Sequence, residues 1–319
     1  MKIILASPRG FCAGVSRAID IVEKALEFFG KPVYVRHEIV HNKHVVDDLK
    51  QKGAIFVEEL KDVPENSIVI FSAHGVPPAV KEEAMKRNLR TIDATCPLVA
   101  KVHWEAIKYT KEGYELVLIG HKGHPEVEGT MGEAPMHLVE NVNDVEKLNI
   151  SGKIAVLTQT TLSVDETKDI MEALRRKFRT IATPPREDIC YATTNRQNAV
   201  KELAKKCELV LVVGSQNSSN SKRLVETAIK EGMKAHLIND KNGIKEEWLN
   251  AKTIGITSGA SAPEKLVQEV IEFFRERNNI VIEQLETVRE DITFPLPREL
   301  SVTAKCQKVA KNQNNTTTF

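Results

Sequence analysis

The chain has 319 residues, of which 41% are hydrophobic and 28% are charged, a balance typical of a globular protein with material for two or three cores. Its 45 Lys and Arg residues nearly balance its 44 Asp and Glu residues, so the net charge of +1 gives no electrostatic reason to expect nucleic acid or an anionic membrane as a partner. An anionic ligand would have to be held by local geometry.

The amino-terminal stretch MKIILASPRGF contains one lysine and an apolar run of only four residues. Because this run is shorter than a signal sequence or a membrane span requires, we expect the protein to stay in the cytoplasm. Disulfides are not expected in that reducing compartment, and the number of cysteines is odd. The five cysteines, at positions 12, 96, 190, 207 and 306, are therefore expected to be core residues, nucleophiles or metal ligands.

Three of the cysteines begin similar segments. Cys12, Cys96 and Cys190 each precede apolar residues at helical spacing, such as Val15 and Ile19 in the first segment, and a turn and a β-branched strand follow. A polar loop then begins 28 or 29 residues after each cysteine, at the following positions: His41, His124 and Ser218. The three segments therefore predict the same order of helix, strand and loop.

A second strand and a second polar loop complete each unit. The strands lie in SIVIFSAHG, KIAVLTQTT and TIGITSGAS, and the loops carry His74, then Thr160 and Thr161, then Ser261. The pattern indicates one α/β module of roughly 90 residues that is used three times. We expect lobes at residues 13–96, at 97–187, and at 1–12 together with 188–280, followed by a C-terminal segment with a polar tail at 281–319.

Alternating strands and helices predict an α/β fold with mainly parallel sheets and right-handed crossovers. Ligand sites in such sheets lie beyond the carboxyl ends of the strands, where all six polar loops are placed. If the three lobes pack around a pseudo-threefold axis, three thiols and six polar loops converge on one site. This convergence, rather than any single motif, is the central prediction from the sequence.

Cysteines at helix N-termini favour metal binding, because the helix dipole and unpaired N–H groups lower the thiol pKa and stabilise the thiolate. A single such cysteine is more often a buried core residue, but the recurrence of three in a repeated unit argues against that role. Three thiolates fit either zinc with a fourth ligand or a cubane iron–sulfur cluster with one open iron. A closed structural zinc would have no use for the surrounding histidines and hydroxyls.

The convergent loops are rich in imidazoles and hydroxyls and poor in Lys and Arg. They contain His41, His74, His124, Glu126, Thr160, Thr161, Thr193, Ser218, Ser219, Asn220 and Ser261. With the N–H groups of helix N-termini, these side chains form a cradle for a diphosphate, although helix capping is the commoner role of each Ser or Thr. Glu126 is the one acid immediately inside these loops, and we expect it to donate protons.

The segment GHKGHPEVEG leaves a second interpretation open. His121, His124 and Glu126 are near enough in sequence for a zinc hydrolase, but glycines interrupt the segment and it lacks the helical i, i+4 pair of histidines that such sites use.

Two cysteines fall outside the repeat. Cys207, at a helix-to-strand junction, is expected to be a packing residue, and Cys306 lies in a polar tail too poor in apolar residues to fold alone.

Nine motifs follow one another along the chain: SPRGFCAG, RHEIVHN, FSAHGV, DATCPLVAKVH, GHKGHPEVEGTMG, TQTTLSVDET, DICYATTNRQ, NSSNSKRL and GASAP. Together they resemble the LytB/IspH family of 4-hydroxy-3-methylbut-2-enyl diphosphate reductases. The resemblance covers about residues 1–300, with Ser7 as a small departure at a position where asparagine is equally expected. It implies three α/β lobes arranged as a trefoil around a central iron–sulfur cluster.

The resemblance also implies a reaction, a cofactor and partners. The allylic alcohol diphosphate is reductively dehydroxylated, with two electrons and two protons, to isopentenyl and dimethylallyl diphosphate at the end of the non-mevalonate pathway. One [4Fe-4S] cluster per chain is held by Cys12, Cys96 and Cys190, and its open iron binds the substrate hydroxyl. Ferredoxin or flavodoxin donates the electrons, no nucleic acid or membrane takes part, and the protein is expected to be a monomer.

Roles for the remaining residues follow from the same resemblance. Glu126 resembles the proton source, which needs a raised pKa in a dry pocket, Thr160 resembles the hydroxyl that orients it, and His124 is the third expected catalytic residue. The expected substrate-binding residues are His41, His74, His124, Thr160, Thr161, Thr193, Ser218, Ser219, Asn220 and Ser261. A sensor that holds a cluster without catalysis is the remaining alternative.

Overall fold

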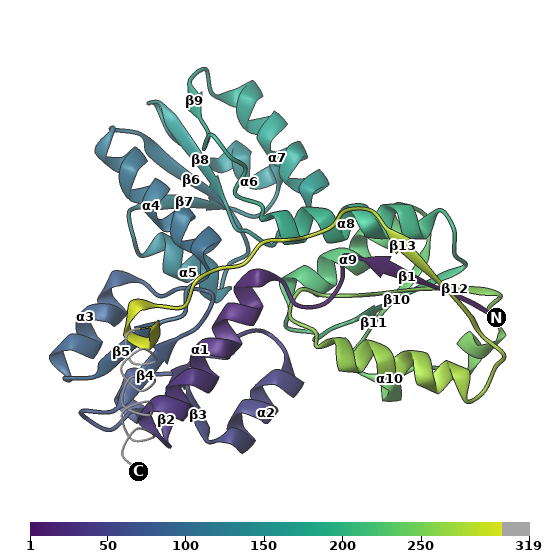
Figure 1. Cartoon of the computed structure of the whole chain (residues 1–319). Coiled ribbons are helices and arrows are strands. Elements are labelled where there is room, and N and C mark those ends of the chain that lie inside the picture. Colours follow the sequence, from purple (N-terminus) through teal and green to yellow (C-terminus); the bar gives the residue numbers. More distant parts are fainter. Residues whose placement is uncertain (302–319) are drawn as a thin grey trace, which may run out of the picture.

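The computed structural model describes residues 1–301 of the chain. Three parallel sheets, each flanked by helices, form three lobes that meet at the centre of the molecule (Figure 1). The predicted α/β class with parallel sheets is confirmed. No helix among the described residues is long and apolar enough to cross a membrane.

The first lobe contains a four-stranded sheet with the order β3-β2-β4-β5. Its strands are β2 (Val33–Arg36), β3 (Ala54–Val57), β4 (Ile68–Phe71) and β5 (Arg90–Asp93). Its helices are α1 (Ala13–Phe29), α2 (Lys43–Lys52) and α3 (Pro78–Lys86), with a 3-10 turn η1 at Leu60–Asp62. Helix α1 packs Val15, Ala18, Ile21 and Val22 into the core of this lobe, as the helical spacing of apolar residues predicts.

The second lobe repeats this arrangement with the strand order β7-β6-β8-β9. Its strands are β6 (Glu115–Ile119), β7 (Met136–Val139), β8 (Ile154–Thr158) and β9 (Ile181–Ala182). Its helices are α4 (Pro97–Lys111), α5 (Pro125–Met131), α6 (Val142–Lys147) and α7 (Val164–Lys177). The predicted N-cap Ser163 is confirmed, since its hydroxyl accepts a hydrogen bond from the N–H of Glu166 at 3.3 Å.

The third lobe is built on a five-stranded sheet with the order β11-β10-β12-β1-β13. Its strands are β1 (Lys2–Ser7), β10 (Leu209–Val213), β11 (Lys234–Ile238), β12 (Thr253–Ser258) and β13 (Val281–Glu286). Its helices are α8 (Tyr191–Ala204), α9 (Ser219–Lys230) and α10 (Glu264–Arg275), with 3-10 turns η2 (Lys241–Gly243) and η3 (Glu246–Asn250). Strand β10 reads LVLVV and is buried along its whole length, because helices cover both faces of the sheet.

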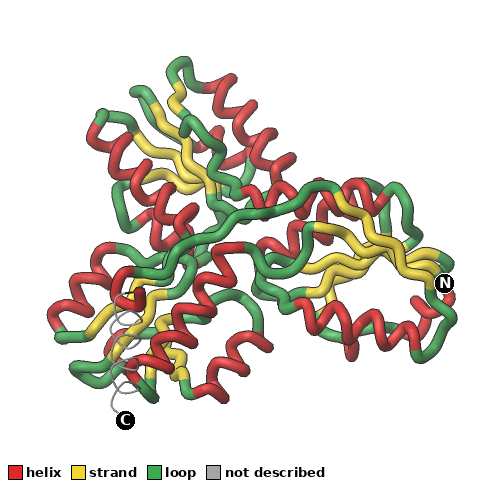
Figure 2. The backbone as a smooth tube through the Cα atoms, in the orientation of Figure 1, coloured by secondary structure: helices red, strands yellow, loops and turns green. Residues whose placement is uncertain are grey.

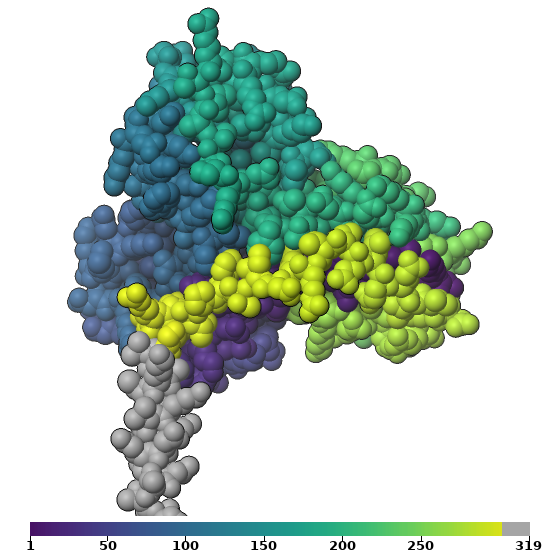
Figure 3. Space-filling model, turned by 45° about the horizontal axis from the view of Figure 1, so that its top comes forward, coloured from purple at the N-terminus to yellow at the C-terminus, as the bar shows by residue number. Residues whose placement is uncertain are grey.

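The chain beyond residue 280 does more than form a tail. Strand β13 pairs in parallel with β1, so it adds an edge strand to the third sheet. Residues 287–301, here called the strap, then cross from the third lobe to the first (Figures 2 and 3). Leu300 is fully buried in the core of the first lobe, where Leu296 also packs. The strap therefore ties these two lobes together, and Cys306 lies outside the described residues.

Candidate active site

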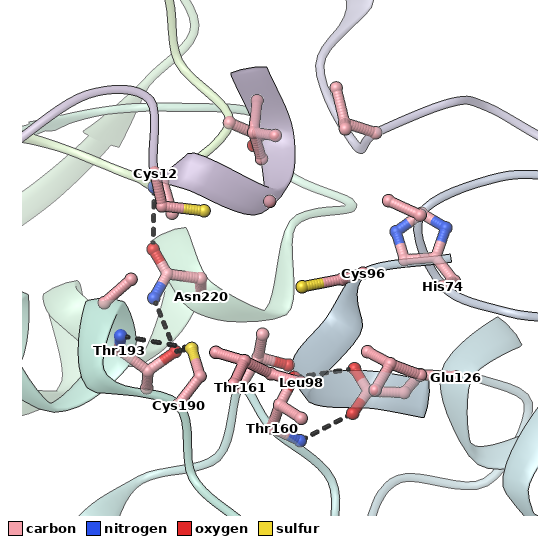
Figure 4. A pocket seen from close by; sticks show the side chains of 18 of the residues that line it. Cys12, His74, Cys96, Leu98, Glu126, Thr160, Thr161, Cys190, Thr193 and Asn220 are labelled. Atoms are coloured by element: carbon pink, nitrogen blue, oxygen red, sulfur yellow. Dashed lines mark hydrogen bonds between the residues drawn. The ribbon is translucent and has the colours of Figure 1, made fainter. Parts of the chain in front are cut away.

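A pocket at the centre of the molecule is lined by residues of all three lobes and of the strap. Every site residue expected from the sequence lines it: Cys12, His41, His74, Cys96, His124, Glu126, Thr160, Thr161, Cys190, Thr193, Ser218, Ser219, Asn220 and Ser261. The sulfur atoms of the three cysteines point toward the space between them (Figure 4). The predicted convergence of thiols and polar loops is therefore a property of the fold.

The three cysteines occupy equivalent positions. Cys12, Cys96 and Cys190 are the N-cap residues of α1, α4 and α8. Their backbone N–H groups donate to carbonyls in the loops after β12, β4 and β8, at 3.2, 2.9 and 3.0 Å, and these carbonyls belong to Ala260, Ala73 and Thr160 respectively. The strands that precede the three cysteines are β1, β5 and β9, and each backbone N–H is thus fixed by the polar loop after the strand that pairs with that preceding strand.

Gly14 allows two of the thiols to approach each other. A Cβ atom at this position would lie 2.7 Å from Sγ of Cys96 and 3.9 Å from Sγ of Cys12. Any side chain here would therefore enter the space between the sulfur atoms. This role of Gly14 was not expected from the sequence, although the residue stands two positions after Cys12 in the motif FCAG.

Burial dominates the chemistry of the thiols. Together with charge on the neighbouring thiols, it raises the pKa of Cys96 to about 12 and that of Cys190 to about 11. The expectation that helix N-termini would lower these pKa values is wrong for these two residues, because desolvation outweighs the N–H groups. A cationic group in the pocket would reverse this balance and favour the thiolates.

The thiols are not arranged around a single ion. Among residues 1–301, no three His, Cys, Asp or Glu side chains are grouped closely enough to hold one metal ion. His121 does not line the pocket, and its Nε2 lies 2.6 Å from Nη2 of Arg223. The residues proposed for a zinc hydrolase are therefore not brought together. Three half-buried thiols that face a shared space fit a larger, multinuclear group.

Glu126 lies in α5 with only 3% of its surface exposed. The backbone N–H of Thr160 donates to its Oε1 at 2.6 Å, and the Thr160 hydroxyl donates to its Oε2 at 3.1 Å. Burial nevertheless raises the pKa of Glu126 to about 7, against the opposing effect of these two bonds. The expected raised pKa is confirmed, so this carboxyl group can hold and release a proton near neutral pH.

Three imidazoles gather at another part of the pocket. The ring centroids of His41 and His74 are 4.1 Å apart, and the ring of His124 lies 5.4 and 5.8 Å from them. Burial and mutual repulsion lower the pKa of His74 well below its usual value and that of His124 to about 3. These two rings are therefore neutral until an anion enters the pocket.

The imidazole nitrogens are prepared for a ligand. Nδ1 of His124 accepts a hydrogen bond from the N–H of Glu126 at 3.2 Å, so the neutral ring carries its proton on Nε2 and can donate it. Nδ1 of His41 pairs with Glu38 at 3.1 Å, while its buried Nε2 has no partner within the described structure. A buried polar atom without a partner is costly, and a bound anion would relieve that cost.

Two hydroxyls in the pocket donate hydrogen bonds from one lobe to another. Ser219 donates to the carbonyl of Thr161 at 3.2 Å, and Ser261 donates to that of His41 at 2.9 Å. Ser218 caps α9 by accepting from a backbone N–H. The hydroxyls of Ser219 and Ser261 therefore have to exchange partners before they donate to a ligand, whereas Ser218 only accepts hydrogen bonds from the described residues and keeps its own proton free.

Asn220 connects the polar residues to the thiols. Its Nδ2 donates to Oγ1 of Thr193 at 3.3 Å, and its Oδ1 accepts from the N–H of Ala260 at 2.9 Å. Thr193 in turn accepts from the thiol of Cys190 at 3.2 Å. Figure 4 shows this chain of contacts.

Apolar residues that were not expected from the sequence also line the pocket. These residues are Val15, Val40, Ala73, Leu98, Val99, Tyr191, Ala192, Ala260 and Phe294. None of the described residues that line the pocket is Lys or Arg. Tyr191 could have been found from its position next to a repeated cysteine, whereas Phe294 comes from the strap, which lies outside the repeat. Cys207 packs as expected, in the core of the third lobe.

The chain is similar to known proteins along nearly its whole length. The family model described as LytB protein matches residues 3–275. The 4-hydroxy-3-methylbut-2-enyl diphosphate reductase of Mannheimia succiniciproducens is 55% identical over 95% of this chain and 99% of its own length. The corresponding reductase of Tolumonas auensis is 56% identical over 95% of this chain and 100% of its own length.

Two solved structures share the fold. The E-1-hydroxy-2-methyl-but-2-enyl-4-diphosphate reductase of Plasmodium falciparum superposes with a TM-score of 0.92 at 44% identity, over 97% of this chain and 99% of that one. An (E)-4-hydroxy-3-methyl-but-2-enyl diphosphate reductase, described as the terminal enzyme of the non-mevalonate pathway, superposes with a TM-score of 0.64 at 32% identity, over 86% of this chain and 99% of that one.

Proposed function

The chain belongs to the LytB protein family, and we propose that its central pocket reduces 4-hydroxy-3-methylbut-2-enyl diphosphate at a [4Fe-4S] cluster held by Cys12, Cys96 and Cys190. The protein is an oxidoreductase that acts on a small diphosphate substrate at the end of the non-mevalonate isoprenoid pathway. The observation that carries the proposed site is that three thiols from three lobes face one pocket, which also contains a histidine cluster and a buried carboxyl group.

The overall reaction exchanges the substrate hydroxyl for hydrogen. The C–O bond breaks, two electrons and two protons enter, and water leaves together with isopentenyl or dimethylallyl diphosphate. When bound, a cluster with one iron free of protein ligands supplies the electrons and a Lewis-acid iron for the hydroxyl. The chain itself has to bind the diphosphate, orient the alcohol, exclude water and deliver protons.

Proton delivery falls to Glu126. Its buried carboxyl group has a pKa of about 7, and Thr160 holds both of its oxygens through a backbone N–H and a hydroxyl. The Thr160 hydroxyl can also contact a substrate alcohol, which would place the alcohol beside the proton source. His124, whose Nδ1 accepts from the Glu126 N–H, is the third residue of this group.

Diphosphate binding falls to the polar residues of the pocket. The proposed ligands are His41, His74, His124, Thr161, Thr193, Ser218, Ser219, Asn220 and Ser261. Because no Lys or Arg lines the described pocket, the positive charge has to come from imidazoles that take up protons as the anion enters. The N–H groups at the start of α9 add further donors.

The proposal includes the setting in which the protein works. We place it in the cytoplasm as a monomer that receives electrons from ferredoxin or flavodoxin. Its four described cysteines are free thiols, as a reducing compartment favours. We keep the lobe boundaries at 13–96, at 97–187 and at 1–12 with 188–280, because each range contains strands of one sheet, and we add β13 to the third.

Replacing Glu126 with Gln tests the proposed roles. We expect Glu126→Gln to lose most of its turnover, because the amide cannot donate the proton, while the affinity for substrate is kept. The control is Glu128→Gln, an exposed change in the same helix. Turnover is followed anaerobically with a low-potential reductant, and binding by calorimetry. Equal loss of turnover and binding would instead make Glu126 a structural residue.

The cofactor is tested by iron and sulfide analysis with Mössbauer spectroscopy, with and without substrate. About four irons per chain, one of which shifts when substrate is added, are expected. Zinc in place of iron, or a cluster that does not respond to substrate, would contradict the proposal.

A further inference from the structure

A long cationic side chain recurs in the helix that follows each cysteine of the pocket. Arg17 stands five residues after Cys12 in α1, Lys101 five residues after Cys96 in α4, and Arg196 six residues after Cys190 in α8. We call Arg17, Lys101 and Arg196 the clamp residues. None of them lines the pocket, so substrate binding does not account for them.

Arg17 holds the segment that leads to the second cysteine. Its Nη1 donates to the carbonyls of Ala94 and Thr95 at 3.3 and 3.1 Å, directly before Cys96. Its Nε donates to the carbonyl of Pro295 in the strap at 2.7 Å. A single guanidinium therefore fixes the helix that begins at one thiol to the residues that precede the next.

Lys101 does the same for the third cysteine. Its Nζ donates to the carbonyl of Arg186 at 2.9 Å and to that of Glu187 at 3.5 Å. It also contacts Oδ1 of Asp188 at 2.7 Å, and the side chain of that aspartate is 1% exposed. These three residues lie two to four positions before Cys190.

Arg196, in the helix capped by Cys190, holds the segment that leads to the first cysteine, Cys12. It is fully buried, and its Nη2 donates to the carbonyl of Gly10 at 2.8 Å, two residues before Cys12. Its Nη1 donates to the carbonyl of Ala192 at 2.9 Å, in its own helix. Its guanidinium also pairs with both oxygens of Glu290 in the strap, at 3.1 and 3.2 Å.

We propose that the clamp residues are positioning residues that set the three distances between the thiols of the pocket. Each clamp joins the helix capped by one cysteine to the chain that leads to the next, so the three clamps fix the three sides of one triangle. This proposal depends on the proposed function, in which the three thiols hold one cluster. Bonds from a cation to a carbonyl are stronger than neutral ones, and residues behind metal ligands tune how tightly the metal is held.

The strap strengthens two of the three sides. Arg17 and Arg196 both contact it, at Pro295 and at Glu290, where it crosses the face of the molecule (Figure 3). Lys101 instead pairs with Asp188 and with Glu105, at 2.7 and 3.3 Å. The side between Cys96 and Cys190 is therefore held by Lys101 and two carboxyl groups rather than through the strap.

The test removes each charged group while it keeps most of the side-chain length. The variants are Arg17→Met, Lys101→Met and Arg196→Met, with Arg17→Lys, Lys101→Arg and Arg196→Lys as conservative changes. The chain offers two matched controls away from the pocket. Arg87 donates to the carbonyl of Val63 at 2.7 Å, and Lys177 donates to the carbonyls of Val145 and Glu146 at 2.8 and 2.6 Å. Arg87→Met and Lys177→Met therefore lose the same kind of bond.

Each protein is reconstituted anaerobically with iron and sulfide, and the loss of the visible absorbance of the cluster to a chelator is followed. We expect the three Met variants to lose iron faster than wild type, on the order of 10- to 100-fold. The conservative variants should recover part of this loss, and the two controls should behave as wild type. The electron paramagnetic resonance spectrum of the reduced cluster should broaden in the Met variants but not in the controls.

The melting temperature of the apoprotein separates positioning from general stability. If iron loss in all five Met variants simply follows the drop in melting temperature, or if the clamp variants retain iron as well as the controls do, the proposal is overturned. If the fully buried Arg196 does not tolerate Met, the less buried Arg17 and Lys101 decide the question.

The same experiment distinguishes this inference from the proposed function. If wild type does not take up about four irons, or if Cys12→Ser, Cys96→Ser and Cys190→Ser keep them, the cluster assignment itself fails. If iron depends on the three cysteines but the clamp variants match their controls, only the clamp proposal fails.

Discussion

The pocket contains two groups of side chains that are built in different ways. The sulfur group, Cys12, Cys96 and Cys190, consists of helix N-caps whose backbones are fixed by hydrogen bonds to neighbouring loops. The anion group consists of His41, His74, His124, Ser218, Ser219, Asn220 and Ser261, which come from loops after strands and from the start of the helix α9 that follows one of these loops. All three thiols of the sulfur group are needed to hold one cluster, whereas several side chains of the anion group can donate hydrogen bonds to the same anion.

The sulfur group therefore depends mainly on fixed distances between its atoms, and the anion group depends mainly on charge and hydrogen bonding. Three thiols can hold one cluster only at fixed distances, so their positions are set by the backbone. A diphosphate is flexible and highly charged, so it can be bound by side chains that rotate, exchange partners and take up protons. We therefore expect a single change in the sulfur group to abolish function, and a single change in the anion group to reduce affinity.

The largest effect is expected for Cys96→Ser. The variant should lose its cluster and all turnover, because a hydroxyl is a poor ligand for iron. Its apoprotein should bind inorganic diphosphate with an affinity within about tenfold of wild-type apoprotein, a difference below 1.4 kcal/mol. Iron analysis and calorimetry measure the two properties. Simultaneous loss of diphosphate binding would show that the two groups are not independent.

Glu126, which belongs to neither group, should make the stability of the apoprotein depend on pH. Its pKa is raised from 4.5 to about 7 in the folded chain, so folding favours the protonated form. The resulting stabilisation is fully present below pH 4.5 and is lost as the pH rises through 7, and it amounts to about 3 kcal/mol. Urea unfolding of wild type and of Glu126→Gln between pH 4.5 and 8.5 measures it.

In that experiment the difference between the two proteins should shrink or change sign as the pH rises, because the amide does not titrate. Glu128→Gln, an exposed change, should follow wild type at every pH. A constant difference between wild type and Glu126→Gln would rule out a raised pKa for this carboxyl group.

The histidines should couple diphosphate binding to proton uptake. The pKa values of His74 and His124 are lowered in the ligand-free pocket, and the charge of the diphosphate raises them again. Affinity should therefore fall as the pH rises, by up to about tenfold per pH unit for each proton taken up. Calorimetry in buffers of different ionisation enthalpy counts the protons directly.

His124→Asn sharpens this measurement, because asparagine can still cap α5 but cannot be protonated. It should reduce proton uptake by up to one proton and weaken binding, whereas the exposed His137→Asn should change neither. Unchanged proton uptake in His124→Asn would assign the protons to other groups.

The repeated pattern made most of this pocket predictable. Each cysteine precedes a helix, and each polar loop follows a parallel strand, so local sequence and sheet topology together bring Cys12, His74 and Ser261 to one place. The raised pKa of Glu126 could also be expected, because a lone acid among apolar and neutral residues is desolvated.

Other properties depend on distances that the sequence does not contain. The thiol pKa values of Cys96 and Cys190 rise because burial outweighs the helix N-terminus, and the degree of burial is set by the packing of three lobes. The role of Gly14 depends on Sγ of Cys96, which is far away in the chain but would lie 2.7 Å from a Cβ atom at position 14. The strap has no repeat or motif, so neither its path nor the position of Phe294 could be predicted.

The smallest effect is expected for Phe294→Ala, which tests whether the strap shields the sulfur group. Phe294 lines the pocket, and Arg17 holds the neighbouring carbonyl of Pro295 at 2.7 Å. Loss of the ring should admit water and oxygen, so the reconstituted cluster should bleach in air about fivefold faster, which corresponds to roughly 1 kcal/mol. Val288→Ala, an exposed change elsewhere in the strap, is the control.

Diphosphate affinity should stay unchanged in Phe294→Ala, because the ring has no polar atom to offer the anion. Weaker diphosphate binding in Phe294→Ala would move this residue into the anion group, and an unchanged bleaching rate would leave the strap as a tie between lobes rather than a shield.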